Sequence, residues 1–304
     1  MNKWIKRSVL GVAGLAILGA AGLALGAYLG DRKAARRVEL PAAAVAAVAI
    51  PTDAASVERG RYLYASRGCA DCHGANGGGH AFIDDGGGFF VKAPNISPGA
   101  GGVVAGYAPE DWVRIIRHGV KPSGQPAFVM PSEDYNRLTD ADLGALVAYV
   151  KQLPPAEGTP MVARIPPMVK VLYGAGLIRD AAEKIDHTLP PSTPVAEDGS
   201  ARHGAYVASM CIGCHGATLA GGKIPGGPPD WPPAANLTPG EGSGMVAYAD
   251  ADQFVAMLRT GKRPDGSAVS AVMPFSSLRE LNDADAKALY AHLKTLGPLP
   301  LGQR

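Results

Sequence analysis

The chain contains one internal repeat, and this repeat constrains the fold more than any other feature of the sequence. When the chain is shifted against itself by about 142 residues, several blocks recur in the same order and at the same spacing. The clearest blocks are Cys69-Ala-Asp-Cys72-His73 with Cys211-Ile-Gly-Cys214-His215, Asn95-Ile-Ser-Pro98 with Asn236-Leu-Thr-Pro239, and Met130-Pro131 with Met273-Pro274. A repeat of this kind predicts two structural units of the same fold.

Each half predicts the same succession of helices. A short helix precedes the cysteines, at about residues 56–66 and 199–209. A middle helix ends near Gly119 or Gly261, and a closing helix begins at Thr139 or Asn282, because these residue types favour such helix ends. Apolar residues recur at helical spacing in the closing helix, and neither half contains a convincing alternating strand pattern. The predicted fold class is all-α.

The predicted organisation has five segments. These are an N-terminal transmembrane anchor at residues 1–30, a spacer at 31–52, a first domain at 53–155, a Pro-rich linker at 156–197 and a second domain at 198–304. We expect one helix within the linker, at about residues 168–184. Because Pro-rich linkers are semi-rigid, we expect the two domains to keep a fixed relation to each other.

Residues 9–29 form an uncharged run of 21 residues near the N-terminus. As an α-helix this run is about 31 Å long, close to the hydrocarbon thickness of a bilayer. A cleaved signal peptide is the alternative, but its apolar region usually spans only about 7–15 residues. Gly22, Gly26 and Gly30 lie four residues apart, and such a stripe predicts packing against another transmembrane helix.

The four cysteines form two pairs in the repeated blocks, and a histidine follows each pair directly. C-x-x-C-H is the motif of c-type haem attachment: each thiol adds to one vinyl group of the porphyrin, and the histidine ligates the iron through Nε2. Two disulfides or a redox C-x-x-C would not require the histidine, and a zinc site would require two more ligands nearby. The sequence therefore predicts two covalently attached haem c groups. Their predicted ligands are Cys69, Cys72, Cys211 and Cys214 for attachment, and His73 and His215 for the iron.

A methionine in each half is the predicted second axial ligand. Met130 and Met273 follow the first cysteine of their own half by 61 and 62 residues, and a proline follows each. A thioether is a soft, neutral ligand that suits haem iron and raises its potential. Methionine is also a common core residue, but the matched placement favours ligation. His118 is a competing ligand in the first half only, because its counterpart is Thr260.

The other histidines and methionines lack a matched counterpart in the repeat. His80, His187 and His203 are predicted to be solvated in loops or in the linker. The remaining methionines are predicted to be core residues: Met161, Met168, Met210, Met245 and Met257.

Two further pairs of residues are candidates for supporting the cofactor. A ligating histidine usually donates its Nδ1–H to a backbone carbonyl, and Pro94 and Ala235 are the expected acceptors. Arg117 and Arg259 occupy equivalent positions in the two halves. They are interpreted either as partners of the haem propionates or as ordinary exposed arginines.

Together these blocks resemble the class I cytochrome c family. The run is most similar to the multihaem cytochrome subunits that accompany periplasmic alcohol and aldehyde dehydrogenases of Gram-negative bacteria, over about residues 56–153 and 199–297. Those subunits often carry three haems, whereas this chain has two C-x-x-C-H motifs. The resemblance implies two tandem cytochrome c-like domains, the haem-binding roles given above, and electron transfer as the task, with catalysis supplied by a partner enzyme.

The expected function is therefore electron transfer, with no catalytic residue in this chain. Histidine and methionine on both irons leave no open coordination position for a substrate. A dihaem peroxidase or a thiosulfate dehydrogenase-like enzyme is the alternative, and it requires one iron with an exchangeable ligand. A redox or gas sensor is a third interpretation, which no attached signalling domain supports.

The expected location is the bacterial inner membrane, with a single pass and the haem domains in the periplasm, because haem attachment to C-x-x-C-H takes place outside the cytoplasm. Expected partners are membrane lipid, a dehydrogenase or quinol-linked complex as electron donor, and a terminal oxidase or soluble cytochrome as acceptor. A net charge of +2, without a Lys/Arg-rich stripe in the body, gives nucleic-acid binding no support.

Overall fold

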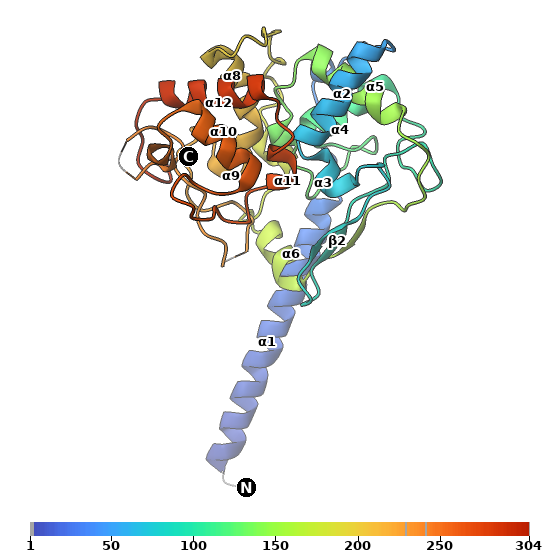
Figure 1. Cartoon of the computed structure of the whole chain (residues 1–304). Helices are drawn as coiled ribbons and strands as arrows, with labels where there is room; N and C mark the ends of the chain where they lie inside the picture. Colours follow the sequence, from blue (N-terminus) through green and yellow to red (C-terminus); the bar gives the residue numbers. More distant parts are fainter. Residues whose placement is uncertain (1–2, 229, 241, 304) are drawn as a thin grey trace.

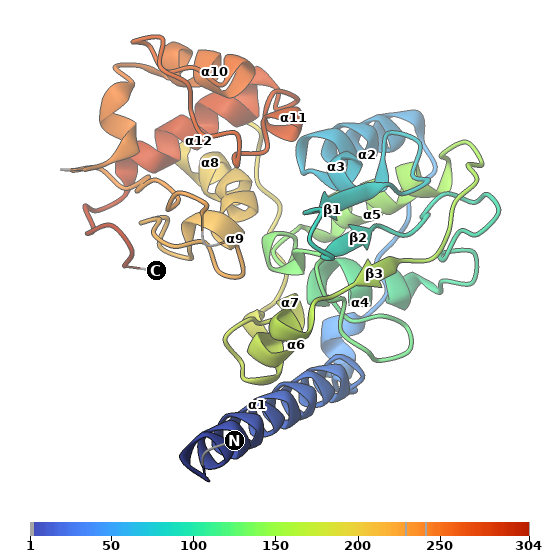
Figure 2. The same ribbon diagram turned by 90° about the horizontal axis from the view of Figure 1, so that it is seen from below.

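A long N-terminal helix projects from a body of two lobes (Figures 1 and 2). The structure is a computed structural model, and it describes residues 3–228, 230–240 and 242–303. The outermost residues of the predicted anchor and second domain, Met1, Asn2 and Arg304, lie outside these ranges. Each lobe has its own hydrophobic core, one between Val48 and Leu153 and the other between Val207 and Leu293. We call them the first and the second lobe.

Both lobes are mainly helical and have corresponding helices, as the repeat predicts. The first lobe contains α2 (Ala54–Ser66), α3 (Cys69–His73), α4 (Pro109–His118), the 3-10 helix η2 (Ser132–Asp134) and α5 (Asp140–Lys151), with η1 (Ala42–Val45) before it. The second lobe contains α8 (Ala201–Ala208), η3 (Ser209–Cys211), α9 (Ile212–His215), η4 (Gly244–Ala247), α10 (Ala251–Thr260), α11 (Phe275–Leu278) and α12 (Asp283–Thr295).

The predicted helix ends are confirmed. Thr139 accepts a hydrogen bond from the Asp142 amide at 3.0 Å, and Asn282 accepts one from the Asp285 amide at 2.7 Å, so both closing helices have side-chain N-caps. The middle helices α4 and α10 end at Gly119 and Gly261 in the left-handed conformation, with φ of 63° and 71°.

In each lobe the first helix crosses the closing helix with backbone contact. A Cβ on Gly60 would lie 2.0 Å from the Ala145 carbonyl oxygen, and a Cβ on Gly204 would lie 1.8 Å from that of Ala288. No side chain fits at such a distance, so a glycine is required at both crossings. The α2–α5 and α8–α12 pairs thus form the same scaffold twice.

The first lobe also carries a small sheet, which the all-α prediction missed. β1 (Ala81–Asp84), β2 (Phe90–Lys92) and β3 (Val162–Arg164) pair antiparallel in the order β1-β2-β3. These strands have three or four residues and a bulge in β1, so no alternating pattern is long enough to be recognised. β3 belongs to the linker and fixes it to the first lobe.

The linker helix predicted at about residues 168–184 is two short helices, α6 (Pro167–Gly174) and α7 (Ala181–Lys184). The chain turns between them at Gly176, with φ of 77°. This positive φ favours glycine and is incompatible with a continuous helix.

Helix α1 (Lys3–Ala34) is the one described helix long and apolar enough to cross a membrane, with a candidate span at Leu10–Ala34 and a mean hydropathy of 2.0. Two of the three glycines in the stripe pack against helix α6 of the same chain. Val171 of α6 packs on Gly26 and the Lys170 backbone on Gly30, while Gly22 has nothing within 4 Å. The prediction of a separate transmembrane helix as the partner is therefore wrong for Gly26 and Gly30.

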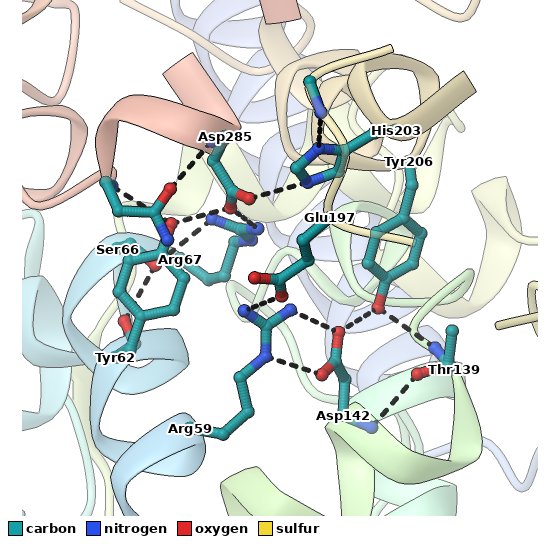
Figure 3. Close-up of polar contacts among 12 residues, drawn as sticks. Arg59, Tyr62, Ser66, Arg67, Thr139, Asp142, Glu197, His203, Tyr206 and Asp285 are labelled. Atoms are coloured by element: carbon teal, nitrogen blue, oxygen red, sulfur yellow. Dashed lines mark hydrogen bonds and ion pairs between the residues drawn. The ribbon is translucent and has the colours of Figure 1, made fainter. Parts of the chain in front are cut away.

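The two lobes meet through a reciprocal pair of tyrosine–aspartate contacts (Figure 3). Tyr62 of the first lobe donates to Asp285 of the second at 2.6 Å, and Tyr206 of the second donates to Asp142 of the first at 2.6 Å. The Tyr206 hydroxyl also accepts a hydrogen bond from the Thr139 amide, and the Tyr62 hydroxyl accepts one from the Asn282 amide, each at 3.2 Å. The same contact is thus made twice, once in each direction.

An arginine balances the charge of each aspartate. Arg67 lies 2.8 Å from Asp285, and both side chains are almost fully buried. Arg59 binds Asp142 through two nitrogens, at 2.8 and 3.0 Å. His203 donates from Nε2 to Asp285 at 2.8 Å and is 2% exposed, so the prediction of a solvated His203 is wrong. Burial by itself raises the pKa of both carboxyls. These partners lower the pKa by more than burial raises it, so the net pKa of each carboxyl lies below the ordinary 3.8.

We predict that Asp285→Asn destabilises the folded chain by about 3 kcal/mol, because it leaves the buried Arg67 without a counter-charge. The control is Asp283→Asn in the same helical turn. Its exposed pair with Arg259 is worth at most about 1 kcal/mol. Urea unfolding of both variants checks this, and equal losses would contradict the central role of the Arg67–Asp285 pair.

We also predict that acid weakens the interface between the lobes. Because the folded pKa values of Asp142 and Asp285 lie below 3.8, their stabilising contribution is complete above about pH 4 and is lost as pH falls through those values. Urea midpoints measured between pH 4 and pH 2 check this. A loss of stability as the pH rises over that interval would contradict this prediction.

Candidate functional site

The two C-x-x-C-H motifs lie in equivalent local structures. Each forms a short helical turn, α3 or α9, that ends at a glycine with positive φ, Gly74 at 75° and Gly216 at 80°. The four cysteines are not paired in disulfides. Burial raises the pKa of Cys69 and Cys211 to about 12, whereas a redox C-x-x-C has a lowered thiol pKa. The disulfide alternative is therefore wrong, and the redox alternative has no support.

The predicted carbonyl partners of the motif histidines are confirmed. The Nδ1 atom of His73 lies 3.0 Å from the Pro94 oxygen, and that of His215 lies 2.8 Å from the Ala235 oxygen. When Nδ1–H donates to a carbonyl, Nε2 is unprotonated and is the nitrogen that ligates a metal. Burial also lowers the pKa of His73, which favours the neutral imidazole that ligation requires. The donor set thus fits haem c.

A buried asparagine in each lobe holds the segment that supplies this carbonyl. Asn95 donates from Nδ2 to the Ala156 oxygen at 2.8 Å and accepts from the Ser97 amide at 2.8 Å. Asn236 donates to the Leu299 oxygen at 2.7 Å and accepts from the Thr238 amide at 2.9 Å.

Both asparagines are at most 2% exposed. No role of their own was predicted for these two asparagines from the sequence. The Asn-x-Ser/Thr-Pro block follows the expected carbonyl directly in both halves, and this recurrence was the available signal for their supporting role.

Met130 and Met273 lie in equivalent positions. Each precedes a proline with nearly the same backbone angles, φ −82° and ψ 61° at Pro131 and φ −78° and ψ 69° at Pro274, and a short helix follows. Each methionine packs partly buried at the edge of its lobe's core, in the same cluster as the first cysteine of its motif. In each lobe, the predicted methionine and the first cysteine of the C-x-x-C-H motif therefore pack against the same core.

The competing ligand His118 already has partners for both ring nitrogens. Its Nδ1 lies 3.0 Å from that of His187, and its Nε2 lies 2.8 Å from the Ala44 oxygen. His187 also contacts the Ala182 oxygen, at 2.9 Å, so the prediction that it is solvated is wrong. His118 joins the spacer and the linker to the first lobe, and this contact favours a structural role.

The two equivalent arginines bind the closing helices. Arg117 lies 2.7 Å from Asp140, and Arg259 lies 3.0 Å from Asp283. Arg117 is 5% exposed, so it is not the ordinary exposed arginine of one interpretation. Both guanidinium groups have a carboxylate partner within their own lobe, and neither contact requires a propionate.

The segment after each methionine contacts the motif of the opposite lobe. Asp134 of η2, four residues after Met130, accepts from the Gly213 amide within the second motif at 2.8 Å. Burial raises the pKa of Asp134 to about 8. Reciprocally, α11, which follows Met273, contacts α3. The two candidate sites therefore adjoin across the interface between the lobes.

Both lobes match a known protein family. Residues 55–150 and 199–293 match the family model described as "Cytochrome C oxidase, cbb3-type, subunit III". The chain belongs to this family of class I cytochrome c domains, whose cofactor is covalently bound haem c.

Several curated cytochrome subunits are similar to the chain. The fructose dehydrogenase cytochrome subunit of Gluconobacter japonicus is 29% identical, over 79% of this chain and 52% of that protein. The gluconate 2-dehydrogenase cytochrome c subunit of Pantoea cypripedii is 26% identical, over 80% and 60%. The alcohol dehydrogenase (quinone) cytochrome c subunit of Gluconobacter oxydans is 26% identical, over 85% and 58%. The chain thus spans between half and two thirds of their length, and all three relatives are named as cytochrome subunits of dehydrogenases.

We predict that Asn95→Ala destabilises the first lobe by about 1–3 kcal/mol, because it leaves buried backbone groups beside Pro94 without their partner. Urea unfolding of the haem-loaded protein measures this. Asn76→Ala is the control, because Asn76 is exposed and bonds only its own turn. If both variants lose the same stability, the buried asparagine is not what holds this segment.

Proposed function

We propose that this chain is a membrane-anchored dihaem cytochrome that transfers electrons on the periplasmic side of the bacterial inner membrane. The observation that carries the proposal is the histidine–carbonyl bond found behind both C-x-x-C-H motifs, at 3.0 and 2.8 Å. Two sites built alike, each in its own lobe, support two tandem cytochrome c domains with one haem each.

The chain's own residues hold and orient the cofactor. Cys69 and Cys72 would attach it in the first lobe, and Cys211 and Cys214 would attach it in the second. His73 and His215 would ligate the iron through Nε2, because the Pro94 and Ala235 carbonyls occupy Nδ1.

Met130 and Met273 would hold the iron from the side opposite the motif histidines. With a histidine and a methionine on each iron, no position would remain open for a substrate, and the chain would act as a carrier. Haem iron supplies the one-electron redox chemistry.

The contacts between the lobes support a relay within the chain. Asp134 links the segment after Met130 to the second motif, and α11 links the segment after Met273 to the first. The proposed donor is a dehydrogenase or a quinol-linked complex, and the proposed acceptor is a terminal oxidase or a soluble cytochrome. The curated relatives, which are cytochrome subunits of dehydrogenases, favour a dehydrogenase complex as the donor.

Helix α1 is the proposed anchor. Its candidate span, Leu10–Ala34, suits a single pass. Because haem attachment takes place outside the cytoplasm, the lobes at its C-terminal end lie in the periplasm.

We predict two haems per full-length chain, measured as pyridine haemochrome per protein and by intact mass. The double variants C69A/C72A and C211A/C214A each remove one attachment site, so each should retain one haem. Two haems in either variant, or one haem in the unsubstituted chain, would contradict the assignment of the four cysteines.

We predict that the reduced wild-type protein does not bind carbon monoxide, because methionine fills the sixth position of both irons. Met130→Ala and Met273→Ala should each open one iron, so that carbon monoxide shifts the visible spectrum of about half the haem. Met257→Leu, in the core of the second lobe, is the control and should behave as wild type. Carbon monoxide binding to the wild-type protein would instead favour the peroxidase or thiosulfate dehydrogenase-like alternative.

A further inference from the structure

The linker exposes an apolar surface that the proposed haem sites do not use. Outside α1, eight large apolar side chains are exposed among the described residues, and four of them lie at positions 161–177. They are Met161, Val162, Met168 and Leu177, with exposed fractions of 36%, 41%, 57% and 72%. The prediction that Met161 and Met168 are core residues is therefore wrong, and something other than the core must account for this surface.

This part of the linker packs directly on the candidate span. Val171 contacts Gly26, the Lys170 carbonyl approaches Gly30, and Gly174 fits against the backbone of the same two glycines. Figures 1 and 2 show α6 beside α1, at the side of the body from which α1 leaves. The exposed Met168 and Leu177 lie on either side of this contact in the sequence.

The depth of the contact follows from the length of the span. A hydrocarbon layer of about 30 Å takes about 20 helical residues, so a span that begins at Leu10 reaches its outer edge near Leu29. Gly26 lies nearly one turn before that edge, and the charged residues begin at Asp31. Helix α6 therefore lies at the level where hydrocarbon meets the head groups.

The charges around α6 agree with this level. Residues 165–178 contain a single charged side chain, Lys170, which pairs with Asp31 at 2.8 Å. Just beyond, Lys33 pairs with Glu183 at 3.0 Å, and Arg36 pairs with Asp180 at 2.8 Å. An apolar segment is thus bordered by ion pairs on the side toward the lobes, as expected for an element lying along a membrane surface.

We propose that residues 165–178 lie in the outer interface of the membrane and bind the lipid surface as a second contact beside the α1 span. Lipid is the occupant because the apolar surface continues the lipid-facing surface of α1 at the same depth. Two contacts instead of one fix the tilt of the lobes over the membrane. This inference rests on the proposed anchoring by α1.

The test uses the full-length, haem-loaded protein in liposomes, with one nitroxide label at a time. The native cysteines are bonded to haem and do not react, which the unsubstituted chain verifies. Leu177→Cys places the label on the linker. Leu18→Cys is the reference for lipid, because it lies in the middle of the span. Val246→Cys is the reference for water, because Val246 is 71% exposed on the second lobe. Electron paramagnetic resonance compares collisions with lipid-soluble oxygen and with a water-soluble nickel complex.

We expect the label at position 177 to collide with nickel several-fold less, and with oxygen more, than the label at position 246. Nickel accessibility equal to that at position 246 overturns the inference, provided that the label at position 18 lies in lipid. Protection from both reagents at position 177 also overturns it, because that result indicates a protein contact instead of lipid. A label at position 18 that lies in water would refute the anchor itself.

Discussion

The arrangement of the molecule depends on the buried aspartates at the lobe interface. Asp285 and Asp142 each lie in the first turn of a closing helix, and each accepts from a tyrosine of the opposite lobe at 2.6 Å. A buried carboxylate is costly unless cations and donors surround it, and here Arg67 and Arg59 provide the cations. Separation of the lobes would remove Arg67 from Asp285 and would remove the tyrosine from each aspartate, so the two halves of the repeat form one body.

This constraint places the two candidate sites next to each other. Because the lobes meet reciprocally, the segment after each methionine reaches the motif of the other lobe, through Asp134 in one direction and α11 in the other. Each site also has its own internal support, since a buried asparagine holds the carbonyl that orients the motif histidine. Electron transfer benefits from both features, because a relay requires fixed cofactors at a short separation.

The sequence predicted features that depend on local chemistry. The N-caps Thr139 and Asn282 and the carbonyl partners of the motif histidines follow from residue type and spacing alone. It did not predict contacts between distant segments. His203 meets Asp285 82 residues away, and the glycine stripe of α1 meets a linker helix of the same chain, so neither partner is visible in a local pattern. The short strands were missed because three or four residues carry no periodicity.

The central claim is that two six-coordinate haems lie close together in one rigid body. Pulsed electron paramagnetic resonance of the fully oxidised, full-length protein tests it most directly. The account predicts two low-spin ferric signals with histidine–methionine character, and a dipolar interaction between them that shows a short, fixed separation. A high-spin signal from either iron, or two low-spin signals without any mutual interaction, would contradict it.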